Sequence, residues 1–273
     1  MFSSILVPLD GSEFGERCLP MASGIARSSA AGVRLAQVLA PIVPAHFLTS
    51  TQFEYQGLDL EEYAERHRAG ANAYLDRLSK DLNEQGISAE PVVLEGKVAD
   101  EIAEYADGHG VSLVVMTTHG RTGVANLWLG SVADAVVRHT SAPVLLMHPG
   151  EADTGPGADL ASIEHIIVPL DGSELAEKIL APALDMARVA AARITLMHVV
   201  SSHAVLGAQL FPLLPDDIRI VQEKAAEYLE RTAADLRASN VPVETHLVES
   251  DVPASSIAEV AASLDGDLIA LAT

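Results

Sequence analysis

Cysteine and basic residues are scarce in this 273-residue sequence. A single cysteine, Cys18, excludes a disulfide within the chain, and we expect it to be a small buried residue on a helix face. Lysine and arginine number 17 against 38 aspartates and glutamates, which gives a formal net charge of −21. Because this charge repels phosphate backbones and no basic cluster opposes it, we expect no nucleic-acid partner.

Long apolar runs are also missing. No stretch reaches the roughly 18 residues that a membrane-spanning helix needs. The sequence does not open with a basic segment followed by an apolar one, as a secretory signal would. We therefore expect a cytoplasmic protein that makes no membrane contact.

The most informative feature that is present is a duplication. Residues 3–13 read SSILVPLDGSE and residues 164–174 read EHIIVPLDGSE, so Asp10 and Asp171 lie 161 residues apart. A period of this size corresponds to whole domains, because solenoid repeats are much shorter. We predict a first copy at 1–148, a Gly- and Pro-rich linker at 149–162, and a second copy at 163–273.

Each copy alternates apolar runs of strand length with amphipathic segments of helix length. The runs are almost continuously apolar, which is typical of parallel strands buried on both faces. In the first copy they are ILVPL, VRLAQVL, AEPVVLE, SLVVMT and APVLLM. Helices are predicted at 13–29, 60–85, 98–108 and 131–140, and in the second copy at 174–190, 217–239 and 253–264.

This order predicts an α/β fold made of two tandem, doubly wound, open parallel sheets. The sequence as given stops at Thr273, before the last helix and strand of the second copy. In such folds ligands bind beyond the carboxyl ends of the strands, at the point where the strand order reverses.

Two segments fall at the expected ligand edge. The first is the Asp-Gly-Ser-Glu turn at Asp10 and again at Asp171. Its aspartate accepts hydrogen bonds from a sugar or base, with the glycine letting the ligand approach the backbone, or else the aspartate or the serine is an ordinary helix N-cap. The residues alone leave both interpretations open.

The second segment is TTHGRTGVANLWLGS at 117–131. Its glycines, Gly120, Gly123 and Gly130, permit the backbone to wrap an anion, and Arg121 offers a charge-assisted contact. Gly130 and Ser131 precede a predicted helix, whose free first-turn amides favour phosphate. The alternative is a glycine-rich turn that only caps the helix.

Together these motifs resemble the universal stress protein family in its tandem form. The resemblance spans 3–147 and 163–273 and implies that the first copy binds ATP. Asp10 would meet the ribose or adenine, and the backbone of Val38 would meet the adenine. The phosphates would be held by Gly120, Arg121, Gly130, Ser131 and Val132. The first glycine of the family's loop falls at Thr117, whose side chain either crowds the nucleotide or supplies a hydroxyl contact.

The resemblance also separates the two copies. The second keeps Asp171 and Val199, but the given sequence ends where its glycine loop would begin, so we expect one ATP per chain. No HExxH or paired CxxC spacing occurs, and any Mg²⁺ is expected to arrive with the nucleotide.

Two alternative functions remain open. One is a nucleotide-free scaffold, which a blocking Thr117 would favour. The other is a weakly ATP-hydrolysing enzyme, although the sequence shows no nucleophile or general-base constellation and His119 is the only histidine in the loop. In this family fifth strands pair, so we expect the run at 142–147 to support a domain–domain pseudo-dimer or a homodimer.

Overall fold

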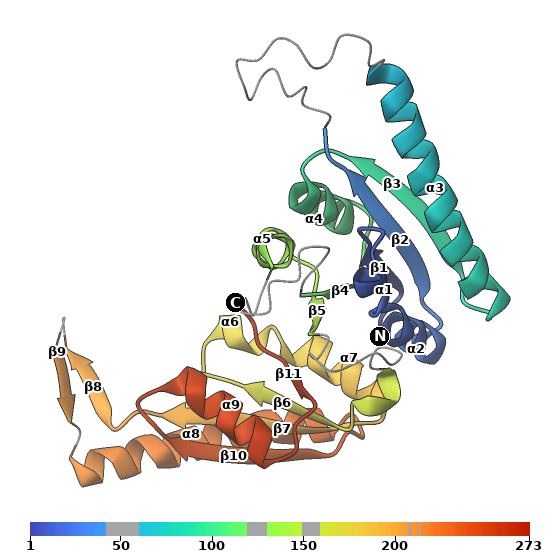
Figure 1. Cartoon of the computed structure of the whole chain (residues 1–273). Helices are drawn as coiled ribbons and strands as arrows, with labels where there is room; N and C mark the ends of the chain where they lie inside the picture. Colours follow the sequence, from blue (N-terminus) through green and yellow to red (C-terminus); the bar gives the residue numbers. More distant parts are fainter. Residues whose placement is uncertain (42–59, 119–129, 149–158, 207–208, 213) are drawn as a thin grey trace, which may run out of the picture. The chain divides into compact units, whose positions relative to one another are not determined.

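The protein is described by a computed structural model that covers residues 1–41, 60–118, 130–148, 159–206, 209–212 and 214–273 (Figure 1). The chain divides into two compact units, Phe2–Leu160 and Ala161–Thr273. No helix in these described ranges combines the length and the hydropathy that crossing a bilayer requires.

The first unit alternates strands and helices. Its elements are β1 (Ser4–Pro8), α1 (Glu13–Glu16), α2 (Leu19–Ser29), β2 (Gly32–Leu39), α3 (Leu60–Glu84), β3 (Ala89–Glu95), α4 (Val98–Gly108), β4 (Leu113–Thr117), α5 (Ser131–His139) and β5 (Val144–Met147). The strands form one sheet in the order β3-β2-β1-β4-β5, and every pairing is parallel. The order reverses between β1 and β4, which confirms the predicted doubly wound fold.

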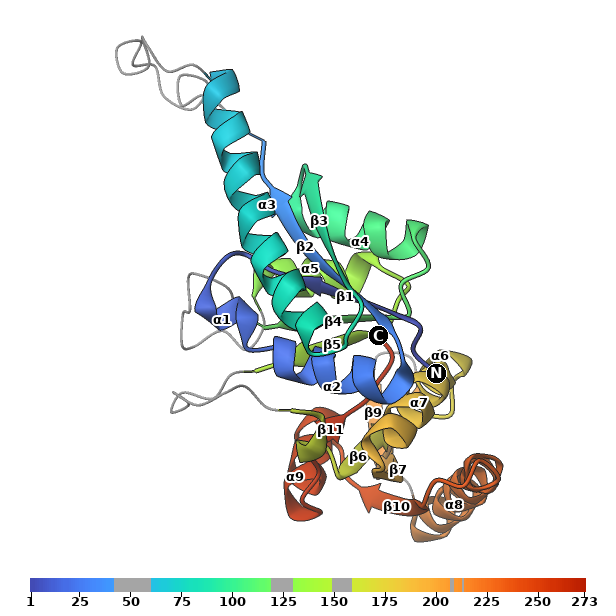
Figure 2. The ribbon, with the colours of Figure 1, turned by 90° about the vertical axis from the view of Figure 1, so that its right-hand side faces the viewer.

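Helices cover both faces of this sheet. Figure 1 shows α3 on one side and α4 and α5 on the other, and Figure 2 looks onto the α3 side. Successive side chains of a strand point to opposite faces. The residues that pack with α4 and α5 are therefore alternating ones, among them Leu6, Ala36, Val114 and Met116.

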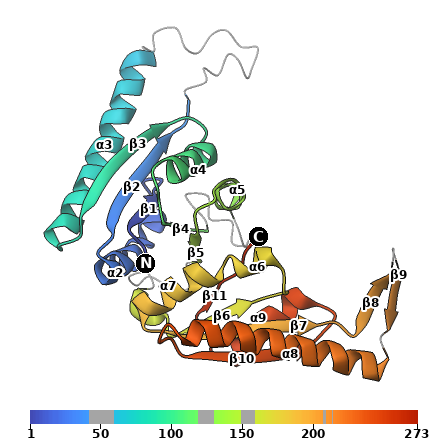
Figure 3. The same ribbon diagram turned by 180° about the vertical axis from the view of Figure 1, so that it is seen from behind.

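The second unit repeats the arrangement with four parallel strands. Its elements are β6 (His165–Pro169), α6 (Glu174–Glu177), α7 (Leu180–Ala190), β7 (Arg193–Val200), β8 (His203–Leu206), β9 (Gln209–Pro212), α8 (Pro215–Arg237), β10 (Val243–Glu249), α9 (Pro253–Ser263) and β11 (Leu268–Ile269). The sheet order is β10-β7-β6-β11, and α8 lies along β10 and β7 (Figure 3). This is the predicted second parallel sheet.

Two details differ from the sequence prediction. The single helix expected at 13–29 is split into α1 and α2, and the one at 174–190 is split into α6 and α7. Proline explains both breaks: Pro20 and Pro182 lie in the first turns of α2 and α7 and have no N–H to donate to the preceding turn.

The second difference is a hairpin that was not predicted. β8 and β9 pair antiparallel, with His203 opposite Pro212 and Leu206 opposite Gln209. The hairpin extends away from the four-stranded sheet (Figure 3). It occupies the connection between the second strand and the long helix, where the second copy is shorter than the first, and connections of this kind tolerate such changes.

Candidate functional site

The Asp10 turn lies at the carboxyl end of β1, next to the reversal of strand order. Leu9 N donates to Ala36 O at 2.7 Å, which carries the sheet one residue past β1. Gly11 then has a φ of 78°, a left-handed conformation that favours glycine. The backbone conformation of this turn therefore favours glycine at position 11, whether or not a ligand binds.

Within the turn, the N-cap is Ser12, and Asp10 orients it. Ser12 Oγ accepts from Gly15 N at 3.0 Å and donates to Asp10 Oδ1 at 2.5 Å, while Ser12 N donates to the same oxygen at 3.0 Å. The cap function is thus performed by the serine. The N-cap interpretation of this turn is therefore confirmed, with Ser12 as the capping residue and Asp10 bonded to it.

Gly15 lets the Asp10 carboxylate rest against α1. A Cβ atom on Gly15 would lie 2.8 Å from Asp10 Oδ1, too close for a normal contact. Below it, Cys18 Sγ donates to Gly15 O at 3.1 Å, and burial raises the pKa of the Cys18 thiol to about 12. Cys18 is therefore a packed, protonated residue, and it has no reactive thiolate at neutral pH.

A second group of side chains joins α1 to α3 behind the turn. Arg77 forms an ion pair with Glu16 at 3.4 Å and lies over the Tyr74 ring, 5.7 Å from its centroid. Burial, and then the Glu16 carboxylate, raise the pKa of Tyr74. No hydrogen bond of normal geometry satisfies the buried Tyr74 hydroxyl within the described part of the chain.

Val38 lies near the end of β2 and Thr117 ends β4, and β1 lies between these two strands in the sheet. Val38 is half-buried in β2, in register with Leu94, and packs against the cluster of α4 and α5. Thr117 is only 8% exposed, and it ends β4 next to Met116. Because Met116 faces α5, the alternation of the strand directs the Thr117 side chain to the opposite face.

The ends of the glycine loop meet at its base. Thr118 N donates to Met147 O at 2.9 Å, and Gly130 N donates to Thr118 O at 2.7 Å. Gly130 is the N-cap of α5, Ser131 is exposed and Val132 is half-buried. Gly120, Arg121 and Gly123 lie outside the described residues.

The start of α5 has the properties of an anion site. Gly130 has φ −71° and ψ 153°, a conformation that any residue can adopt, so the backbone does not demand glycine here. Without a side chain, Gly130 itself cannot cap the first-turn amides of α5, and amides at a helix N-terminus favour negatively charged groups. The one acid of this turn, Asp134, is paired with Arg138 through bonds of 3.0 to 3.1 Å.

The corresponding turn of the second unit has the same local bonds in a different setting. Ser173 N donates to Asp171 Oδ1 at 2.9 Å, Ser173 Oγ accepts from Ala176 N at 3.1 Å, and Gly172 has a φ of 82°. Hydrogen bonds from Ser173 lower the pKa of Asp171. Asp171 is exposed, whereas Asp10 is half-buried. Val199, the counterpart of Val38, pairs with Val248.

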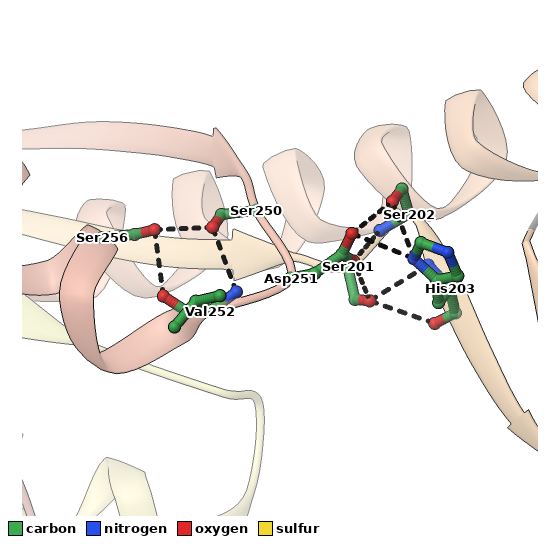
Figure 4. A network of polar contacts seen from close by, with 7 residues as sticks. All are labelled: Ser201, Ser202, His203, Ser250, Asp251, Val252 and Ser256. Carbon is green, nitrogen blue, oxygen red and sulfur yellow. Dashed lines mark hydrogen bonds and ion pairs between the residues drawn. The ribbon is translucent and has the colours of Figure 1, made fainter. Parts of the chain in front are cut away.

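A polar network at the carboxyl edge of β7 and β10 was not predicted (Figure 4). Asp251 accepts from Ser201 Oγ at 2.7 Å, from Ser202 N at 3.0 Å and from Ser202 Oγ at 2.8 Å, and its Oδ2 lies 2.9 Å from His203 Nδ1. The bonds from Ser201, His203 and Ser202 hold the pKa of Asp251 well below its usual range. A second set of hydrogen bonds joins Ser250, Val252 and Ser256, which lie on both sides of Asp251 in the chain.

The network ties the end of β7 to the connection after β10. Its signal in the sequence was weak, because Ser201 and Asp251 are fifty residues apart and only the fold brings them together. Among the residues that the structure describes, no three His, Cys, Asp or Glu side chains gather as a metal site would require. The network is therefore a set of internal hydrogen bonds and one ion pair.

Comparison with known proteins adds a family. The family model of the universal stress protein family matches residues 1–148 and 162–273. The universal stress protein YxiE of Bacillus subtilis is 30% identical over 161 residues, covering 54% of this chain and 99% of that protein. The universal stress protein Rv1996 of Mycobacterium tuberculosis is 24% identical over 270 residues, covering 94% of this chain and 82% of that protein.

A solved structure agrees with the fold. The universal stress protein from Archaeoglobus fulgidus superposes with a TM-score of 0.63 at 18% identity, covering 97% of this chain and 83% of that chain. At this identity the likeness supports the tandem architecture alone.

Proposed function

This chain belongs to the universal stress protein family, and on that premise we propose that its first copy binds ATP as a regulatory nucleotide. The proposed site runs along the carboxyl edge of the five-stranded sheet, from Val38 on β2 past Asp10 after β1 to the start of α5. Arg121 and Gly120 join it from the loop, and Mg²⁺ would arrive with the nucleotide.

One observation carries the proposal: two sites of opposite chemistry lie at the ends of adjacent strands. β1 and β4 are paired in parallel, so Asp10 and the segment after Thr117 are at the same edge of the sheet. The carboxylate suits ribose hydroxyls or a base amine, and the first-turn amides of α5 suit phosphate. The strand order reverses between these strands, as at the ligand edges of doubly wound folds.

Glycine at position 130 supports the phosphate end. Its backbone conformation is open to every residue, so the absence of a side chain must have another reason. Close approach of a ligand to the backbone supplies one. Thr117, in turn, has its side chain buried on the face away from α5, which speaks against its crowding a phosphate at that helix.

Assembly belongs to the same proposal. Among the described residues, β5 is one of the two edge strands of its sheet, and an edge offers unpaired backbone groups to another strand. We place the expected pairing of domains or of two chains there.

Titration with ATP tests the proposal. Trp128 is the only tryptophan and lies within the loop sequence, so its fluorescence should respond to occupancy. Calorimetry on the same full-length protein should give a saturable heat with ATP and Mg²⁺. The proposal fails if neither measurement detects binding at millimolar ATP, and turnover within seconds would indicate an enzyme in place of a regulatory module.

A further inference from the structure

A histidine that the site does not yet include lies beside the base of the glycine loop. His148 directly follows β5 and is exposed. Its Nδ1 lies 3.1 Å from Thr118 Oγ1, on the residue that directly follows β4. Thr118 itself is 7% exposed. The imidazole thus meets a buried hydroxyl at the edge where we place the phosphates.

Thr118 connects this histidine to the helix that would bind the phosphates. Its amide is held by Met147 O at 2.9 Å, and its carbonyl accepts from Gly130 N at 2.7 Å. Gly130 is the N-cap of α5. Backbone bonds therefore hold both the amide and the carbonyl of Thr118, and the contact from His148 acts on its side chain.

We propose that His148 is a positioning residue for the phosphate end of the ATP site, an inference that rests on the proposed function. The imidazole holds the Thr118 side chain, and this fixes the direction of the Thr118 carbonyl. The carbonyl in turn holds Gly130 N, which sets where the first-turn amides of α5 point. His148 acts through Thr118, and it is not assigned a contact with the nucleotide.

The position of the histidine predicts selectivity among ligands. Asp10 follows β1 and Val38 lies in β2, whereas His148 and Thr118 follow β5 and β4 on the other side of the reversal. Loss of the imidazole should therefore lower the affinity for ligands that carry phosphates. The affinity for adenosine should not change. A merely structural residue would affect both ligands, together with the stability of the domain.

Three variants of the full chain test this. Replacement H148A removes the contact, and H148N keeps an amide nitrogen near the place of Nδ1. Replacement T118V removes the hydroxyl but retains the backbone bonds. ATP and adenosine binding are measured by calorimetry, and thermal unfolding is followed in parallel.

We expect H148A to weaken ATP about 3- to 10-fold, the size of one net hydrogen bond. H148N should recover most of this loss, and adenosine affinity should stay within about twofold of the wild type. T118V should weaken ATP at least as much as H148A, and the double variant should lose no more than T118V alone.

Two results would overturn the inference while leaving ATP binding in place. One is an H148A protein that binds ATP like the wild type. The other is an equal loss of ATP and adenosine, accompanied by a lower unfolding temperature. A wild-type protein that binds adenosine but shows no gain from the phosphates would reject the phosphate end of the proposed function, and this inference with it.

Discussion

The two Asp-Gly-Ser-Glu turns have the same sequence and different surroundings. Both have a serine N-cap, a glycine with φ near 80° and a bond from the serine amide to the aspartate. Yet Asp10 is half-buried against Gly15, whereas Asp171 is exposed and Ala176 stands at the position equivalent to Gly15. Local sequence therefore determines the turn, while one residue of the following helix and the surrounding elements determine how its carboxylate is held.

The carboxyl edges differ in a second way. At the ends of β7 and β10 the second copy carries Ser201, Ser202 and Asp251, which bond to one another. The first copy has Ala40, Pro41 and Lys97 at the corresponding positions. The second edge thus satisfies its polar groups internally, and the first has no equivalent network at these positions. This contrast is consistent with a ligand site in the first copy alone.

The largest effect is expected from G130D. The aspartate fits φ −71° and ψ 153° and would cap α5, so the fold should be kept. Its carboxylate would occupy the amides and repel phosphate, which should lower ATP affinity about 100-fold or more. Calorimetry measures the loss of ATP affinity, and thermal unfolding checks that the fold is kept. Unchanged ATP binding would show that α5 is not the phosphate site.

A smaller effect on ATP binding is expected from G15A. This change places alanine at position 15, as the second copy has at the equivalent position 176. The new Cβ would lie 2.8 Å from Asp10 Oδ1. Displacement of the carboxylate should weaken ATP binding about tenfold, whereas stability should change by less than about 1 kcal/mol, because the atom that must move ends a side chain and alanine favours a helix over glycine. The matched change, A176G, should leave ATP binding unchanged and cost at most about 1 kcal/mol. Equal effects of the two changes on ATP binding would refute the difference between the turns.

The acid stability of the second copy is the next test. Because the folded pKa of Asp251 is depressed, its contribution is complete above the unfolded value of about 3.9 and is lost as pH falls through the folded pKa. The wild type should therefore be more stable than D251N at pH 6, and the gap should close in strong acid. Urea unfolding of both proteins, from pH 6 down to strong acid, measures this difference in stability.

The control is D216N, because the Asp216 side chain is 91% exposed. This variant should differ little from the wild type at any pH. A gap between the wild type and D251N that stays constant with pH would show that the network does not depend on the Asp251 charge.

The smallest effect is expected at a feature that the copies share. Tyr74 and Tyr228 occupy equivalent helix positions, and both buried hydroxyls are without a hydrogen bond of normal geometry in the described part of the chain. Burial, and then Glu177, raise the pKa of Tyr228 to about 12. Y74F and Y228F should each change stability by less than about 0.5 kcal/mol in urea unfolding. A loss above about 1.5 kcal/mol would reveal a hydrogen bond to the neighbouring glutamate.

The sequence predicted the sheets well, because continuous apolar runs identify buried parallel strands. It did not show the breaks before Pro20 and Pro182, since the apolar period continues through them. The hairpin at His203–Pro212 was missed because its two runs of four residues are too short to show a period. The Asp251 network depended on residues fifty positions apart, and only folding makes them neighbours.

The site was predictable to the extent that its chemistry is local. Asp10 and Gly130 stand out because each follows a strand and precedes a helix. Which residue caps α1 was not decidable, because an aspartate and a serine two positions apart are both good caps. His148 was overlooked, because its partner Thr118 follows a different strand and a lone histidine after a strand carries no motif.

The stoichiometry of ATP binding tests the central claim most directly. Calorimetry would compare the wild type with D10N and D171N, the same change in the two turns. We expect one ATP per chain, a strong loss of affinity in D10N and wild-type binding in D171N. Two ATP molecules per chain, or equal losses in the two variants, would contradict the account.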